Sequence, residues 1–190
     1  KSGKASPSAG NGEAKTATDD ARREMNEALH LLGRLVELKP TVERESLCGS
    51  AWKRIAFLEA RAKRVDEEVK AIERMKEHYE RAETIARRLR LPDFYYPALN
   101  RMAAELVLNG RDARWKGFDR DDVAALRECL GQVTRRYPDL WNVVSGTELV
   151  QNEAVAKRKL ASAINGILSE YKDLHARISD PANWQSVRDQ

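Results

Sequence analysis

The side chains that could bind a metal ion or act as nucleophiles are few and widely spaced in this sequence. The chain of 190 residues has three histidines and two cysteines. No histidine has a second histidine four residues away, and neither a CxxC nor a HExxH spacing occurs, although metal ligands on a helix need such pairs to face one ion. The sequence therefore predicts no metal site. The histidines are His30, His78 and His175.

Other chemistry-bearing patterns also favour structural roles. Asp119, Asp121 and Asp122 lack the spacing and the glycine of a calcium loop, and they suit the start of a helix instead. No glycine-rich phosphate-binding loop and no GxSxG nucleophile motif is present. Cys48 and Cys129 lie in apolar helical contexts, which predicts buried free thiols in a reducing compartment. We therefore expect no catalytic residue and no cofactor, and we expect that the protein is not an enzyme.

The charge balance argues against a nucleic-acid surface. Thirty-four basic and 30 acidic residues give a net charge of +4, and the basic clusters share their helices with Asp and Glu. Phosphate binding needs a one-sided basic surface. Arg135 and Arg136 close a predicted helix, where positive charge is favoured, and they are candidates for contact with a partner.

A few aromatic residues are expected at the surface as anchors for a partner. Trp115 stands in a predicted loop, and Tyr95 and Tyr96 precede Pro97 at a break between helices. Exposed aromatics are frequent anchors of protein interfaces. Trp52 and Trp141, by contrast, are predicted to pack between helices. The candidate partner-binding residues are Trp115, Tyr95, Tyr96, Arg135 and Arg136.

Apolar residues at helical spacing predict that the elements positioning these side chains are all helices. No run approaches the ~20 apolar residues of a membrane-spanning helix, so we expect a cytoplasmic protein without a membrane partner. Residues 1–17 read as a flexible linker or an expression remnant, and residues 18–190 as one helical domain that is truncated at its C-terminus. We expect helices over 19–39, 41–62, 66–89, 97–109, 119–136 and 147–178, the last divided near 157–159, and the start of a further helix after Pro181.

One stretch of small residues predicts where two of these helices interlock. Cys48, Gly49, Ser50 and Ala51 carry almost no side-chain bulk, so a neighbouring helix can approach closely there. The next predicted helix carries an aromatic residue and then alanines on one face. The predicted structural seam consists of Gly49, Ala51, Trp52, Tyr79 and Ala82. Paired helices repeated along the chain indicate an all-α fold of antiparallel hairpins, about seven or eight helices stacked as an α-solenoid.

These same residues carry a resemblance to a known family. At GSAWKRIA and HYERAETIA the chain resembles the tetratricopeptide pattern, with Gly49 and Trp52 on the first helix and Tyr79 and Ala82 on the second. The succession LCGSAWKRIAFL, YYPALNRMAAEL, DLWNVV and WQSVRDQ is similar to the divergent TPR-S family over about residues 28–190. The resemblance implies a TPR-like fold without catalysis. It also implies assembly or signal relay to a neighbouring effector domain, such as a caspase-like or CHAT domain, in bacterial conflict systems.

The function that we expect is therefore a protein-protein interaction or scaffold domain that regulates an adjacent effector domain in a larger bacterial protein. Its partner would be a neighbouring domain or another protein chain, and homo-oligomerisation is a further expectation. The alternative, which the charge balance disfavours, is a nucleic-acid-contacting helical-repeat module.

Overall fold

The computed structural model describes residues 9–177, 184 and 187, with side chains from residue 19 onward. These residues form seven α-helices, and none of them is in a strand. The helices are α1 (Ala9–Leu38), α2 (Val42–Arg61), α3 (Val65–Arg88), α4 (Tyr95–Asn109), α5 (Arg120–Arg136), α6 (Leu140–Ala156) and α7 (Leu160–Arg177).

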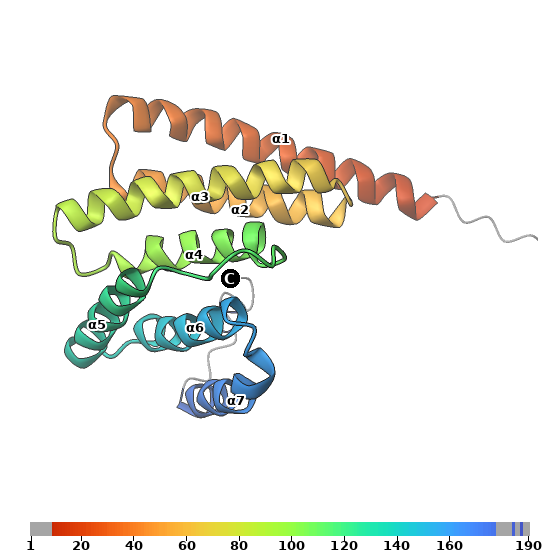
Figure 1. Ribbon diagram of the computed structural model, residues 1–190. Helices are drawn as coiled ribbons and strands as arrows, with labels where there is room; N and C mark the ends of the chain where they lie inside the picture. The colour runs from red at the N-terminus through yellow and green to blue at the C-terminus, as the bar shows by residue number, and fades with distance from the viewer. Residues whose placement is uncertain (1–8, 178–183, 185–186, 188–190) are drawn as a thin grey trace, which may run out of the picture.

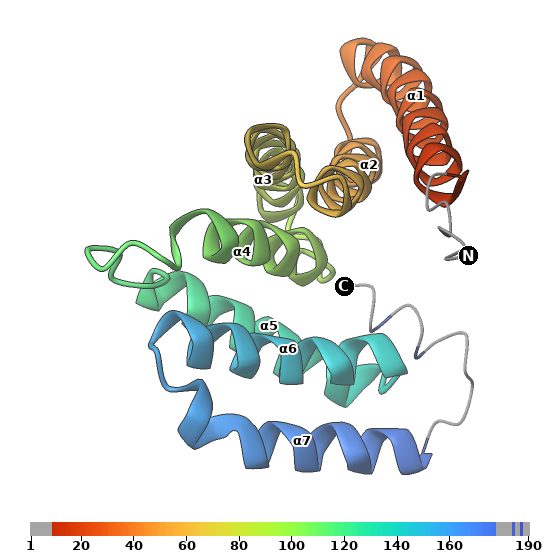
Figure 2. The ribbon, with the colours of Figure 1, turned by 90° about the vertical axis from the view of Figure 1, so that its right-hand side faces the viewer.

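The helices are stacked in the order of the chain (Figures 1 and 2). Each helix contacts the next one, and α4 also contacts α6 across the repeat. Short connections between antiparallel neighbours produce this serial packing, because each hairpin must bury its apolar face against the following one. The predicted all-α solenoid is confirmed, and so is the interruption between α6 and α7 near residues 157–159.

Side-chain caps explain several of the helix starts. The Thr41 hydroxyl accepts a hydrogen bond from the Arg44 N–H at 3.2 Å, and the Asp119 carboxylate accepts from the N–H groups of Asp121 and Asp122. These caps confirm the predicted starts of α2 and α5. Asp139 caps α6 in the same way, so the predicted start at residue 147 was wrong.

One other boundary prediction was wrong. α1 begins at Ala9 rather than at residue 19, because alanine, glutamate and lysine are strong helix formers and no proline interrupts the segment. The division of the chain at residue 17 stays a prediction. The helix expected after Pro181 lies outside the described residues.

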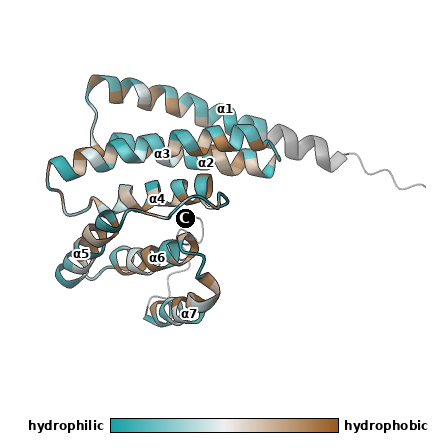
Figure 3. Ribbon diagram, viewed as in Figure 1, coloured by the Kyte–Doolittle hydropathy of each residue, from teal (hydrophilic) through white to brown (hydrophobic). Residues whose placement is uncertain are grey.

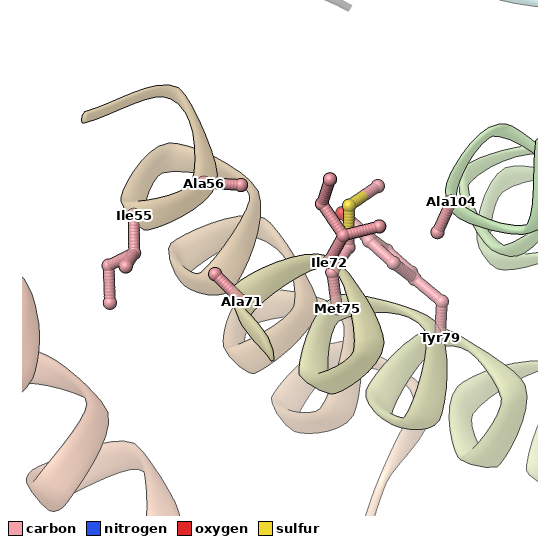
Figure 4. Close-up of a cluster of buried hydrophobic side chains, with 7 residues drawn as sticks. All are labelled: Ile55, Ala56, Ala71, Ile72, Met75, Tyr79 and Ala104. Carbon is pink, nitrogen blue, oxygen red and sulfur yellow. The ribbon is translucent and has the colours of Figure 1, made fainter. Parts of the chain in front are cut away.

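Small apolar side chains make the core between α2, α3 and α4. Met75 and Tyr79 of α3 fill the space between these helices, while alanines allow the backbones to approach (Figure 4). A second cluster joins α4, α5 and α6. Hydrophilic and hydrophobic residues alternate along each helix, as expected for one buried and one solvated face (Figure 3). The first cluster consists of Ile55, Ala56, Ala71, Ile72, Met75, Tyr79 and Ala104.

Some predicted core positions are exposed instead. Trp141 is 37% exposed. Leu47, whose helical spacing with Ala51 and Ile55 also predicts burial, is 47% exposed. The buried stripe of α2 runs through Cys48, Ala51 and Ile55, so Leu47 falls beside it. Which side of α2 is buried depends on the angle at which α3 crosses it, and the sequence pattern alone does not contain that angle.

Buried glutamates connect the helices in addition to the apolar contacts. Glu45, Glu59 and Glu83 are each less than 7% exposed. A buried carboxylate is costly unless it is paired, and each of these has two basic partners, at least one of them on another helix or turn. The partners are His78 and Arg81 for Glu45, Arg22 and Arg64 for Glu59, and Arg87 and Arg101 for Glu83. None of these networks was predicted.

Candidate functional site

The five seam residues lie between α2 and α3. A Cβ atom at Gly49 would lie 2.7 Å from Cε2 of Tyr79, so the ring occupies the space of the missing side chain. Tyr79 is 1% exposed and Ala82 is fully buried. Ala51 is buried and Trp52 packs against the same cluster. Because these side chains are covered, the places where a partner can bind lie elsewhere.

The five predicted partner-binding residues do not form one surface. Tyr95 and Arg136 line the same cleft. Tyr96 instead turns toward the seam, where its ring meets that of Tyr79 edge to face at 6.1 Å. Trp115 is half-buried and packs edge to face on Phe118 at 5.3 Å, and Arg135 lines a different hollow, between α5, α6 and α7.

The cleft with Tyr95 and Arg136 lies between the α3–α4 connection, α5 and the start of α6, and has a volume of about 740 Å³. Two irregular connections, residues 89–94 and 137–139, bring their aromatic residues to it. We call it the aromatic cleft. Its lining includes Arg87, Arg90, Phe94, Tyr95, Cys129, Arg136 and Tyr137.

Arginine side chains lie over the aromatic rings of the cleft. The Arg87 guanidinium carbon is 4.3 Å from the centroid of Phe94, and that of Arg136 is 5.4 Å from the centroid of Tyr137. Arg87 is also paired with Glu83 at 2.7 Å. Arg90 and Arg136 make no ion pair within the described part of the chain, which leaves two guanidinium groups available to carboxylates of a partner.

Acidic residues of the aromatic cleft offset the positive charge of its arginines. Asp93, Glu128 and Asp139 also line the aromatic cleft, although the Asp139 carboxylate is already used as the cap of α6. The lining therefore combines both signs of charge with aromatic surface. Such a mixed composition is typical of protein interfaces, whereas a surface for a phosphate backbone is mainly positive.

Two other groups in the cleft are held by hydrogen bonds. The Tyr95 hydroxyl donates to Oδ1 of Asn142 at 2.5 Å, and burial raises the pKa of this phenol. The Cys129 thiol donates to the Pro92 carbonyl at 3.1 Å, and burial raises its pKa as well. A protonated thiol is a poor nucleophile. Both groups therefore fix the shape of the cleft rather than supply reactivity.

Sequence reasoning missed the remaining aromatic and basic residues of this cleft. Phe94 and Tyr137 stand in segments that were predicted as irregular, LPDFYYP and YPDLW, and that signal was sufficient to include them as candidates. The sequence did not indicate, however, that these two segments lie side by side in the fold. Within the described residues, no group of three or more His, Cys, Asp or Glu side chains is arranged to hold a metal ion.

The fold and the cleft together define a helical-repeat protein, in which hairpins of antiparallel helices pack in series around a continuous core. The profile of the family TPR-S, described as Tetratricopeptide Repeats-Sensor, matches residues 7–106, and the chain belongs to this family. The predicted resemblance is confirmed. The match begins further toward the N-terminus than we predicted and ends in α4, so α5, α6 and α7 lie beyond it.

Neither a curated protein nor a solved structure matches the chain. Among the described residues, no helix is both long and apolar enough to cross a membrane.

Proposed function

We propose that this protein is a non-catalytic interaction domain that binds a protein segment in the aromatic cleft and relays that event to an adjacent effector domain. Tetratricopeptide-type repeats generally bind proteins, which supports this class of function. The bacterial conflict system, the cytoplasmic location and the neighbouring effector belong to the same proposal.

The meeting of Tyr95 and Arg136 in one cleft is the observation that carries the proposal. A partner segment would insert an apolar or aromatic side chain among the aromatic rings and displace water from them. It would place a carboxylate on Arg90 or Arg136. Buried aromatic and arginine anchors contribute most of the binding energy in many interfaces, and a charge-assisted pair with arginine adds orientation.

Selection from a random peptide library on the full chain tests this proposal. The binders should carry Asp or Glu next to Phe, Trp or Leu, and Arg136→Glu should weaken them at least about tenfold because it reverses a charge at the contact. Arg111→Glu is the matched control, since Arg111 is exposed in the loop at the other end of α4. Binders that are insensitive to Arg136→Glu, or a library without binders, would refute the proposal.

A nucleic acid is the competing partner, and the three acidic residues in the cleft speak against it. Electrophoretic mobility with single-stranded RNA at two salt concentrations separates the two proposals. Salt-sensitive binding would favour the nucleic acid, because phosphate contacts weaken steeply as salt increases. Light scattering over a range of protein concentrations tests self-association.

A further inference from the structure

The outer face of α1 carries an apolar stripe that stays exposed. Leu31, Leu35 and Leu38 are 65%, 42% and 81% exposed, and their spacing of four and three residues places them on one side of the helix. Met25 and Leu29 of the same helix pack against the first core cluster instead. The outer face of an end helix in a repeat stack is normally polar. We call the three exposed residues the leucine stripe.

Charged residues of opposite sign lie along the same side of α1. Glu27 and Glu24 come one and two helical turns before Leu31, and Arg34 comes three residues after it. None of these three charged side chains has an ion pair within the described residues. The face of α1 therefore changes from acidic to apolar and basic toward the end of the helix.

At the other end of the stack (Figure 1), a groove of about 630 Å³ lies over α6 between α5 and α7. Its floor is largely apolar and includes Val143, Gly146 and Val150 of α6, of which Val150 is exposed. Outside its own stretch of helix, no atom lies within 4 Å of the place of a Cβ atom at Gly146. The middle of the floor is therefore hollow. We call this surface the α6 groove.

Two arginines line the end of the α6 groove near the start of α6. Arg135 follows Thr134, whose hydroxyl donates to a carbonyl near the start of α6 at 3.4 Å. Arg177 comes one turn after Leu174, which packs against the same part of α6. Neither arginine has an ion pair within the described residues. Asp173 lines the groove as well and offsets only one of the two positive charges.

The far end of the α6 groove lacks a free positive charge among the described residues. Glu170 lies there and accepts a hydrogen bond from the Thr147 hydroxyl at 3.1 Å. Arg127 lines this end too, but it is already paired with Glu153. Because Arg127 precedes Arg135 by eight residues, about 12 Å of helix separates the two ends of the groove.

We propose that the leucine stripe of one copy docks in the α6 groove of a second copy, so that the protein assembles head to tail. Glu27 pairs with Arg135, and Leu31 fills the hollow of the floor. Arg34 then reaches Glu170, because it lies seven residues after Glu27, or about 10 Å of helix. Since the stripe and the groove are different surfaces, each pair keeps one free stripe and one free groove, and further copies can add to it.

Sedimentation equilibrium of the full chain over a range of concentrations tests this assembly. The average mass of the wild type should rise beyond that of a dimer. Leu31→Arg puts a charge on the stripe and Gly146→Leu fills the hollow, so each variant alone should stay monomeric. Leu168→Arg is the matched control, since Leu168 is an exposed leucine of α7 that does not line the groove, and it should assemble as the wild type does.

A mixture of the two blocked variants distinguishes head-to-tail docking from a symmetric dimer. Leu31→Arg keeps an intact groove and Gly146→Leu keeps an intact stripe, so the equimolar mixture should form a one-to-one complex that does not grow. Both variants should unfold cooperatively in circular dichroism, because neither position is tightly packed.

The charges give a second check that does not depend on Gly146→Leu. Glu27→Arg and Arg135→Glu should each weaken assembly at least about tenfold, and their equimolar mixture should restore it, because both contacts are then complementary again. A wild-type chain that stays monomeric or stops at a dimer would refute the proposal. Mixtures of complementary variants that remain monomeric would refute it as well.

Discussion

The ring of Tyr79 on α3 occupies the place of a side chain at Gly49 on α2, where a Cβ atom would approach Cε2 to 2.7 Å. Tyr79 cannot move away easily, because it is 1% exposed and belongs to the cluster that joins α2, α3 and α4. Gly49 thus lowers the local helix propensity of α2, but it allows an aromatic side chain to pack against the helix backbone.

Replacement of Gly49 should destabilise the protein. Gly49→Leu should lower the free energy of unfolding by about 1 to 3 kcal/mol through overpacking against Tyr79. Gly33→Ala is the control, because nothing lies within 4 Å of a Cβ atom there, and it should stabilise α1 by up to about 1 kcal/mol. Urea denaturation measures both changes. Wild-type stability of Gly49→Leu would contradict the close contact.

The buried pair of Glu83 and Arg101 should be sensitive to loss of one partner. Arg101 Nε lies 2.6 Å from the carboxylate, and the two side chains are 13% and 7% exposed. Glu83→Ala should therefore cost about 3 kcal/mol, since it leaves Arg101 buried without this partner. Glu83→Met combined with Arg101→Met should recover much of that loss. The single variants Glu83→Met and Arg101→Met complete the comparison. A loss of unfolding free energy in the double variant equal to the sum of their two losses would contradict the coupling.

Glu148 should make stability fall as the pH rises. Its pKa is about 7 in the folded protein, above the ordinary value of 4.5, so the folded state binds more protons than the unfolded state between these values. The free energy of unfolding should decrease through that window by at most about 3 kcal/mol, and level off above it. Lys53 and Tyr171 line the same small cavity as Glu148, which lies between α2, α4, α6 and α7, and they are the titratable groups beside it. The difference between wild type and Glu148→Gln, measured by urea denaturation over pH, isolates this contribution; a flat difference would contradict it.

The hydroxyl of Tyr95 should contribute to stability as well as to the cleft. Tyr95→Phe removes the donor to Asn142, which is 3% exposed, and should cost about 1 to 3 kcal/mol because the amide oxygen loses its partner. Tyr137→Phe is the matched control. Tyr137 is 60% exposed, so this change should lie within about 0.5 kcal/mol of wild type. Thermal unfolding measures both changes. An equal decrease in Tm for the two variants would contradict a stabilising role of the Tyr95 hydroxyl.

The two thiols should be protected in the native protein. Cys48 is 1% exposed and Cys129 is 8% exposed, and burial is the largest cause that raises the pKa of each thiol. Labelling with a thiol reagent at neutral pH should therefore be slow and should accelerate greatly in denaturant. Fast labelling of one thiol before unfolding would show local opening around it.

The class of fold and most of the helix bounds were predictable because they depend on local information. Apolar spacing, Thr41 and Asp119 as caps, and the break near residues 157–159 act within a few residues of chain. The predictions failed where a helix continued without a strong signal, as in α1, or where a cap lay inside a segment that looked irregular, as at Asp139.

The sequence by itself determined that this chain folds into helical hairpins with small residues at one seam, because helix propensity, capping and side-chain bulk are properties of neighbouring residues. Only the tertiary structure decided that Tyr95 meets Arg136 while Tyr96 turns to Tyr79. It also decided that Glu148 and Lys53 line the same cavity. These relationships depend on the angles and offsets at which successive helices pack, and such angles arise from the fit of whole side-chain surfaces.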